Sequence, residues 1–249
     1  NAQYKNTIGN WNNTVGHNSM YNNTSGSYNN AIGTGSLFSN STGNNNIAIG
    51  ENSLYNNTTG YSNVAVGVHA LRNNTANSNL VAVGDSALFS NSTGTANVAL
   101  GSKSLYSNQS GIANTAAGFE ALNENISGNN NTANGNRSLY NNTAGNQNTA
   151  MGSQSLLSNI SGIRNTGIGS LALSASTGDN NVALGYQAGN TNTTGNNNTL
   201  IGYGADVSTG NQSNSSALGL NATVNASNKI RLGNSAVTVI EGQPASYTS

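Results

Sequence analysis

Apolar and polar residues along this chain repeat in a fixed pattern that returns at every seventeenth residue. A glycine marks each repeat, and we number every repeat from this glycine as position 0. The marker glycines are Gly16, Gly33, Gly50, Gly67, Gly84, Gly101, Gly118, Gly135, Gly152 and Gly169, followed after an interval shorter by one residue by Gly185, Gly202 and Gly219. A fixed short period predicts a solenoid in which each repeat forms one coil stacked on the next.

Two positions of the repeat are apolar in nearly every coil and predict the secondary structure. Position −1 holds Val15, Ile32, Ile49, Val66, Val83, Leu100, Met151, Ile168, Leu184 and Ile201. Position +4 holds Met20, Leu37, Leu54, Leu71, Leu88, Leu105, Leu122, Leu139, Leu156 and Leu173. These residues lie in segments that are too short for a helix and often β-branched, such as Val64-Ala65-Val66. We therefore expect an all-β fold with two short strands in each coil.

Stacking predicts where the side chains lie. Coils about 4.8 Å apart place identical positions above one another, so leucines at +4 and aliphatic residues at −1 are expected to form a thin core. Glycines at 0 and +10 are expected at corners that need a positive φ or a close backbone approach. Asparagine at −4 tolerates left-handed geometry, and its amide is expected to bond the copy in the next coil.

Alanine at position −2 bears on oligomerisation. We expect it to face away from its aliphatic neighbours, where a column of small residues allows another chain to approach. Two apolar residues and an alanine per coil bury little area for one chain, so we expect a homotrimer to complete the burial.

Composition excludes several classes of protein. Charged residues make up 6% of the chain and the net charge is zero, whereas disordered chains usually combine low hydrophobicity with high charge. The seven basic residues are scattered, which argues against nucleic-acid binding. There is no apolar run long enough to span a bilayer, no segment of the given residues has the pattern of a signal peptide, and there is no cysteine. His17 and His69 lie in coils that are not neighbours, so no metal site and no cofactor are expected.

The repeated pattern Asn-x-Ala-Ile-Gly-x-x-Ser/Ala resembles the head repeats of YadA-like trimeric autotransporter adhesins. The resemblance covers roughly residues 6–219. The family's repeat is commonly shorter, which implies a longer loop here, at the Asn-x-Thr/Ser-Gly segment. The resemblance implies a homotrimer of left-handed parallel β-rolls that displays a surface adhesin or fibre.

Near the C-terminus, a second segment carries another resemblance. Residues 228–243, Asn-Lys-Ile-Arg-Leu-Gly-Asn-Ser-Ala-Val-Thr-Val-Ile-Glu-Gly-Gln, resemble the segment before the self-cleaving intramolecular chaperone (peptidase S74) domain of phage tail fibres and tailspikes. In that family the chaperone assembles the trimer and cuts itself off just after a serine. The resemblance therefore implies a processed C-terminus at Ser249. We expect a repeat β-roll over residues 1–219 and a neck over residues 220–249 that ends at the cleavage point.

Two sets of residues are candidates for chemistry. Glu51 and Asp85 share position +1 two coils apart, hence roughly 9.5 Å by stacking, a separation that glycoside hydrolysis could use. Position +1 also holds His17, Thr34, Val68 and Ser102, which favours an exposed variable position and no enzyme. Candidate N-glycosylation sites share one position of the coil: Asn40, Asn57, Asn91, Asn108, Asn125 and Asn159.

These observations favour a structural and adhesive role outside the cell, on a cell surface or a virion. The expected partners are copies of the chain itself, in a trimer and in end-to-end filaments, and a cell-surface glycan or an extracellular-matrix receptor. One alternative is a monomeric ice-binding solenoid, although its threonine column at position +9 is interrupted by Ala76 and Ala144. A second alternative is a polysaccharide-degrading tailspike.

Overall fold

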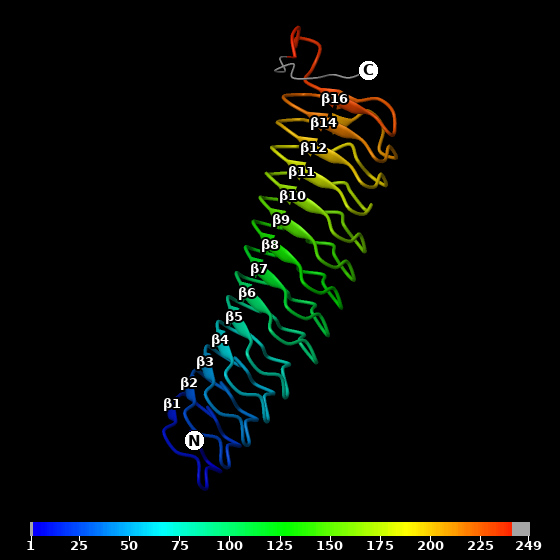
Figure 1. Cartoon of the computed structure of the whole chain (residues 1–249). Coiled ribbons are helices and arrows are strands. Elements are labelled where there is room, and N and C mark those ends of the chain that lie inside the picture. The colour runs from blue at the N-terminus through cyan, green and yellow to red at the C-terminus, as the bar shows by residue number, and fades with distance from the viewer. Residues whose placement is uncertain (1, 241–249) are drawn as a thin grey trace, which may run out of the picture.

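The chain forms a rod of stacked β-coils. The structure, a computed structural model, describes residues 2–240, and these residues contain strands and turns but no helix. Figure 1 shows the coils following one another along the rod from the N-terminal to the C-terminal end. Asn13 lies opposite Asn30, and Asn30 opposite Ile47, so each repeat forms one coil. The prediction of an all-β solenoid with one coil per repeat is confirmed.

One parallel sheet runs along the rod. Its strands lie next to one another in sequence order and occupy positions −3 to −1 of the repeat. They are β1 (Asn13–Val15), β2 (Asn30–Ile32), β3 (Ile47–Ile49), β4 (Val64–Val66), β5 (Val81–Val83), β6 (Val98–Leu100), β7 (Thr115–Ala117), β8 (Thr132–Asn134), β9 (Thr149–Met151), β10 (Thr166–Ile168), β11 (Val182–Leu184), β12 (Thr199–Ile201), β14 (Ser216–Leu218) and β16 (Ile230–Leu232). At the usual spacing of about 4.8 Å between strands, the sheet is roughly 60 Å long.

The predicted second strand of each coil is wrong for most of the rod. Only β13 (Asp206–Val207) and β15 (Thr223–Val224) form a second, two-stranded sheet within residues 2–240. In the ten coils from Met20 to Leu173, the residue at position +4 instead has a φ between 47° and 52°. This left-handed backbone costs about 1–2 kcal/mol for a residue with a Cβ, whereas burying a leucine gains about 1.5–3 kcal/mol. All ten side chains are fully buried, so burial outweighs the conformational cost.

The interior and exterior of the strands are the reverse of the prediction. Alanine at position −2 is fully buried, as in Ala48, Ala82 and Ala99, and the aliphatic residues at −1 point outward. Side chains alternate along a strand, so the narrow space opposite the buried leucines takes the small residue, and its two larger neighbours face out. The alanine column is therefore part of the core and not a surface for another chain.

Two asparagine ladders, at positions −4 and +7, hold the coils closed. At position −4, as in Asn46, the side-chain amide donates to the carbonyl of Gly60, and its Oδ1 accepts the backbone N–H of Asn63, the same position in the next coil. The predicted bond between coils is confirmed. The left-handed geometry that asparagine tolerates is found one residue earlier, as at Asn45 with a φ of 57°.

Glycine occupies position 0 in every coil and position +10 in most of them, where Asn77 and Gln212 are exceptions, and the two positions favour it for different reasons. Gly84, at position 0, has a φ of +136°, and an added Cβ would lie 2.5 Å from the carbonyl carbon of Gly101 in the next coil. Gly94, at position +10, has no left-handed φ, but an added Cβ would lie 2.5 Å from the carbonyl oxygen of Gly111. The two explanations offered by the sequence both apply at position 0, and only the close approach applies at +10.

The stack continues beyond the predicted boundary at residue 219. Strand β16 pairs with β14, with Ser216 opposite Ile230, so the last coil is three residues shorter than the regular repeat. The other short coil, which lacks one residue, joins β10 to β11, with Thr166 opposite Val182. Both shortened coils keep the strands in register because the missing residues are taken from the loops.

Candidate interaction surface

The outward side of the long sheet is an uncharged surface that follows the length of the rod. We call it the sheet face and define it by positions −3 and −1 of β1–β12 and β14. Its residues are Asn13, Val15, Asn30, Ile32, Ile47, Ile49, Val64, Val66, Val81, Val83, Val98, Leu100, Thr115, Ala117, Thr132, Asn134, Thr149, Met151, Thr166, Ile168, Val182, Leu184, Thr199, Ile201, Ser216 and Leu218. None of these residues is charged. Several are large apolar side chains left in solvent, such as Ile32 at 44% and Leu100 at 42% exposure.

The sheet face changes character along the rod. In β3–β6 both columns are aliphatic, and their residues are neighbours in register, as with Ile47, Val64 and Val81. In β7 and β8 the aliphatic pattern stops, at Thr115–Ala117 and Thr132–Asn134. From β9 onward position −1 is aliphatic again, while position −3 is mainly threonine. The sequence signal for this face was the aliphatic residue at −3 in addition to the one at −1, which the prediction did not use.

A second column, at position +5, consists of stacked aromatic rings. Tyr4, Tyr21, Phe38 and Tyr55 follow one another with centroids 4.9–5.5 Å apart and nearly parallel planes. The guanidinium of Arg72 continues the column 5.4 Å from the Tyr55 ring. The rings of Tyr21 and Phe38 are covered on both faces by their neighbours, so these rings offer no free aromatic face to a sugar ring. The column stabilises coil stacking, since such aromatic pairs contribute about 0.5–1.5 kcal/mol each.

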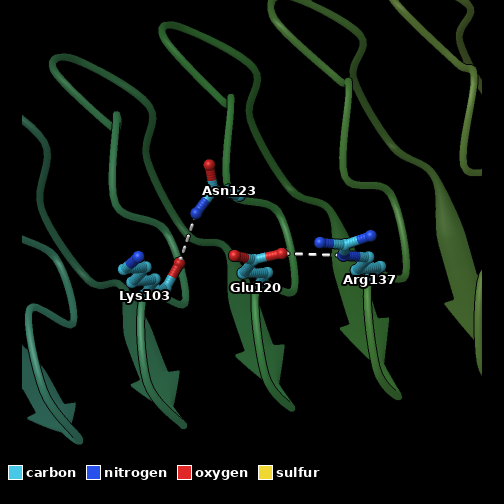
Figure 2. Close-up of polar contacts among 4 residues, drawn as sticks. All are labelled: Lys103, Glu120, Asn123 and Arg137. Carbon is cyan, nitrogen blue, oxygen red and sulfur yellow. Dashed lines mark hydrogen bonds and ion pairs between the residues drawn. The ribbon is translucent and has the colours of Figure 1, made fainter.

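Charged residues gather near the middle of the rod, in the coils that carry β6–β8 (Figure 2). Arg137 Nε donates to Glu120 Oε2 over 2.7 Å, and Asn123 donates from its amide to the Lys103 carbonyl over 2.9 Å. The Arg137 guanidinium also lies 5.5 Å from the Tyr140 ring. The Arg137 side chain is 47% exposed, so this ion pair contributes little to stability. It does not belong to the sheet face.

The candidate glycosylation asparagines all lie inside the coil, at position +7. Each is fully buried, and its side-chain amide donates two hydrogen bonds. In Asn57 one goes to Asn40 Oδ1 over 2.9 Å and the other to the Gly60 carbonyl over 3.0 Å. The same pair of bonds occurs at Asn40, Asn91, Asn108, Asn125 and Asn159. A glycan would replace one of these donors and has no room in the folded coil, so the geometry argues against the sequon stripe, although its occupancy stays a prediction.

The carboxylates considered for catalysis, Glu51 and Asp85, do not lie in an enclosed site. Glu51 and Asp85 are exposed in the position +1 column, with Val68 in the coil between them. Within residues 2–240 there is no cavity, and no group of three or more metal-binding side chains. His17 and His69 lie three coils apart. The described part of the chain also contains no helix that could cross a membrane.

One carboxyl group is electrostatically unusual. Burial raises the pKa of Asp206, at the start of β13, because the charged form loses hydration. Hydrogen bonds from the backbone of Thr191 and Val207, over 2.9 and 2.8 Å, lower the pKa and oppose this effect in part. Asp206 lies near the C-terminal end of the rod and has no acidic partner among the described residues that would suggest catalysis.

Comparisons with known proteins found no match for this chain: no protein-family model matches it, and no curated protein matches it. Ser249, the predicted processing point, lies outside the described residues.

Proposed function

We propose that this chain is the shaft or head of a homotrimeric extracellular fibre, either a bacterial surface adhesin or a fibre of the phage-tail type. In this role the stiff rod holds a receptor-binding surface away from its anchor. The observation that supports the proposal is the sheet face, an uncharged and largely aliphatic surface that follows the whole rod. Water-exposed apolar surfaces of this length are typical of interfaces with another protein.

The size of the sheet face fits contact with copies of the same chain. With a length of about 60 Å and a width of about 10 Å, it covers roughly 600 Å² per chain, which a trimer shares between two neighbours; each pairwise contact is smaller than the roughly 800 Å² per partner of a standard interface, and three such contacts together close the assembly. Identical copies can pack these faces together without bringing like charges into contact, because the face has none. A rotation axis parallel to the rods closes such an assembly and covers the face of every copy.

The two sequence resemblances support the extracellular role. The repeats of residues 6–219 resemble the heads of trimeric adhesins, and residues 228–243 resemble the neck upstream of the chaperone of phage fibres. A fibre with three equivalent, nearly uncharged outer surfaces would bind glycans or matrix proteins by avidity, in which several weak contacts act together.

Native mass spectrometry of the chain at micromolar concentration tests the proposal. We expect a mass three times that of the single chain. Leu100→Glu places a charge in the sheet face and should yield monomers that keep their β-sheet circular dichroism. Gln109→Glu adds a charge to the same coil at an exposed residue outside the face and should leave the trimer intact. A wild-type chain that is folded and monomeric would overturn the proposal.

The sheet face also favours one second function, a monomeric ice-binding protein. Its regularly spaced threonine and aliphatic side chains, without charges, form the kind of ordered surface that can align water. The position +9 column, considered from the sequence, is interrupted and lies elsewhere on the coil. A monomeric native mass together with inhibition of ice recrystallisation, lost in Leu100→Glu and kept in Gln109→Glu, would support this function instead of the fibre.

A further inference from the structure

Asn134 is the only polar residue at position −1 in the sheet strands β1–β12, β14 and β16. Its backbone is held in β8, with Thr132, Ala133 and Asn134 in register with Thr149, Ala150 and Met151. Its side chain is exposed and makes no hydrogen bond within the described residues 2–240. The amide therefore stands alone in a column of Val, Ile, Leu, Met and Ala, near the middle of the rod.

We infer that Asn134 fixes the axial register of the chains in the homo-oligomer, and this inference rests on the proposed fibre. In an in-register assembly around an axis parallel to the rods, the Asn134 side chains of all copies lie at one height. A primary amide has both donors and an acceptor, so a ring of Asn134 side chains can satisfy one another across the axis. The polar Thr132 beside it keeps the same level of the face free of large aliphatic groups.

Sliding one chain by a coil breaks this arrangement. Because every coil has nearly the same shape, the aliphatic contacts of β3–β6 alone would accept a shift of one or two coils at little cost. Asn134 would then face Ala117 or Met151 of a neighbouring copy after a shift of one coil, or Leu100 or Ile168 after a shift of two, and would lose its amide partners in either case. The penalty for one unpaired buried amide corresponds to roughly a 5- to 150-fold preference for the in-register assembly. A single polar residue that sets register in an apolar interface is well attested in coiled coils.

Disulfide trapping measures the register directly, because the chain has no cysteine of its own. One version carries Val83→Cys in β5, and a second version, with a mass tag, carries Ala117→Cys in β7. In register, these cysteines are two coils or about 9.6 Å apart along the axis, beyond the roughly 7 Å between Cα atoms that a disulfide can bridge. The two versions are refolded together, oxidised, and separated without reductant.

We expect the unsubstituted background to give disulfides between like chains only. Asn134→Val should keep the oligomer and raise the share of disulfides between unlike chains about tenfold, since shifted registers then lose no amide partner. Asn136→Val is the matched control: it makes the same change at an exposed residue of the same coil, at position +1 and off the sheet face, and should add no unlike pairs. Adding Ile168→Asn to Asn134→Val should restore like-only pairing by moving the amide to β10.

The outcomes separate the two proposals. If Asn134→Val stays trimeric and gives like-only pairing, the register inference is wrong and the fibre stands. If the unsubstituted chain is monomeric and forms no disulfide, the fibre proposal fails and the register inference fails with it.

Discussion

The two faces of the long sheet follow different rules although their residues alternate along the same strands. Inside, position −2 is alanine in strand after strand, as at Ala82 and Ala99, because each coil packs against neighbours of the same shape. Outside, position −1 varies between valine, isoleucine, leucine, methionine, alanine and asparagine. In β2–β9 stacking keeps the interior residue at position −2 unchanged, whereas the exterior differs from coil to coil. Residues that select a binding partner can therefore vary on the exterior without disturbing the stacking of the coils.

The glycine at position 0 gives the largest expected effect of coil stacking on a residue. Gly84→Ala places a Cβ 2.5 Å from Gly101 at a φ of +136°, so we expect the coils to separate locally and the free energy of unfolding to fall by about 3 kcal/mol or more. Urea denaturation followed by circular dichroism measures this loss. Gly167→Ala is the control, because Gly167 occupies position −2 and has no left-handed φ. Its added Cβ would lie 3.1 Å from the Ala172 carbonyl oxygen, a contact that a small shift relieves, so the loss should be much smaller than in Gly84→Ala. Equal losses from both substitutions would contradict this explanation.

Leucine-to-alanine substitutions compare the two faces within one coil. Leu105 is fully buried and Leu100 is 42% exposed. We expect Leu105→Ala to lower the free energy of unfolding by about 2–5 kcal/mol, through lost burial and a cavity. Leu100→Ala should change the unfolding of the isolated chain by less than about 0.5 kcal/mol and should instead weaken self-association. Sedimentation equilibrium beside denaturation separates these effects, and a large loss of monomer stability in Leu100→Ala would refute the distinction.

The aromatic column at position +5, whose side chains are half-buried, tests whether stacking between coils also stabilises residues outside the core. Arg72 takes the place of a ring in the column between Tyr55 and Phe89, and its Nε is buried without a hydrogen-bond partner among the described residues. Arg72→Tyr should therefore raise the free energy of unfolding by about 0.5–1.5 kcal/mol, since a ring continues the stack. Thermal denaturation of this variant beside Arg164→Tyr, at an Arg whose side chain bonds Gln147, provides the comparison. Equal shifts in the two variants would show that the stack contributes nothing.

The smallest expected effect concerns Asp206. Its folded pKa is raised by burial, so the folded state holds the proton more tightly than the unfolded state. Stability from this group is present in full below the ordinary carboxyl pKa of 3.8 and decreases as the pH rises through the raised folded pKa. The difference in unfolding free energy between wild type and Asp206→Asn should follow this course in a pH series. A difference that grows in the opposite direction would contradict the assignment of burial as the main cause.

Sequence reasoning predicted the coil but not its inside and outside. The glycine period and the lack of helix-forming runs were enough for the stacked β-solenoid, because a repeat of this length can bury side chains only against its own copies. The predicted directions of the Ala48 and Ile49 side chains were wrong because the larger apolar residue was assumed to be the buried one. In a narrow coil the buried leucine at Leu54 leaves room for only an alanine opposite it, which is a property of the closed cross-section and not of any one segment.

Neither the glycosylation sites nor Asn134 could be judged from the sequence alone, because both depend on which side chains the closed coil turns inward. Asn57 satisfies a sequon in the sequence, but only the closed coil shows that its amide spans two neighbouring acceptors. The role of Asn134 was not predicted, because position −1 was assigned to the core and a polar residue there carried no meaning. Once that position is known to face outward, the exception becomes the informative residue.

The buried asparagine ladder at position +7 has a mechanical consequence. It runs without a break from Asn6 to Asn159, and in the next coil its place is taken by Ser176, whose Oγ is buried without a partner among the described residues. A tension applied along the rod passes through every coil in series, so each coil bears the whole load. The coil with the weakest contacts to its neighbours therefore sets the force at which the rod unfolds. We expect the coils to separate first between Asn159 and Asn192, at the coil that is also one residue short.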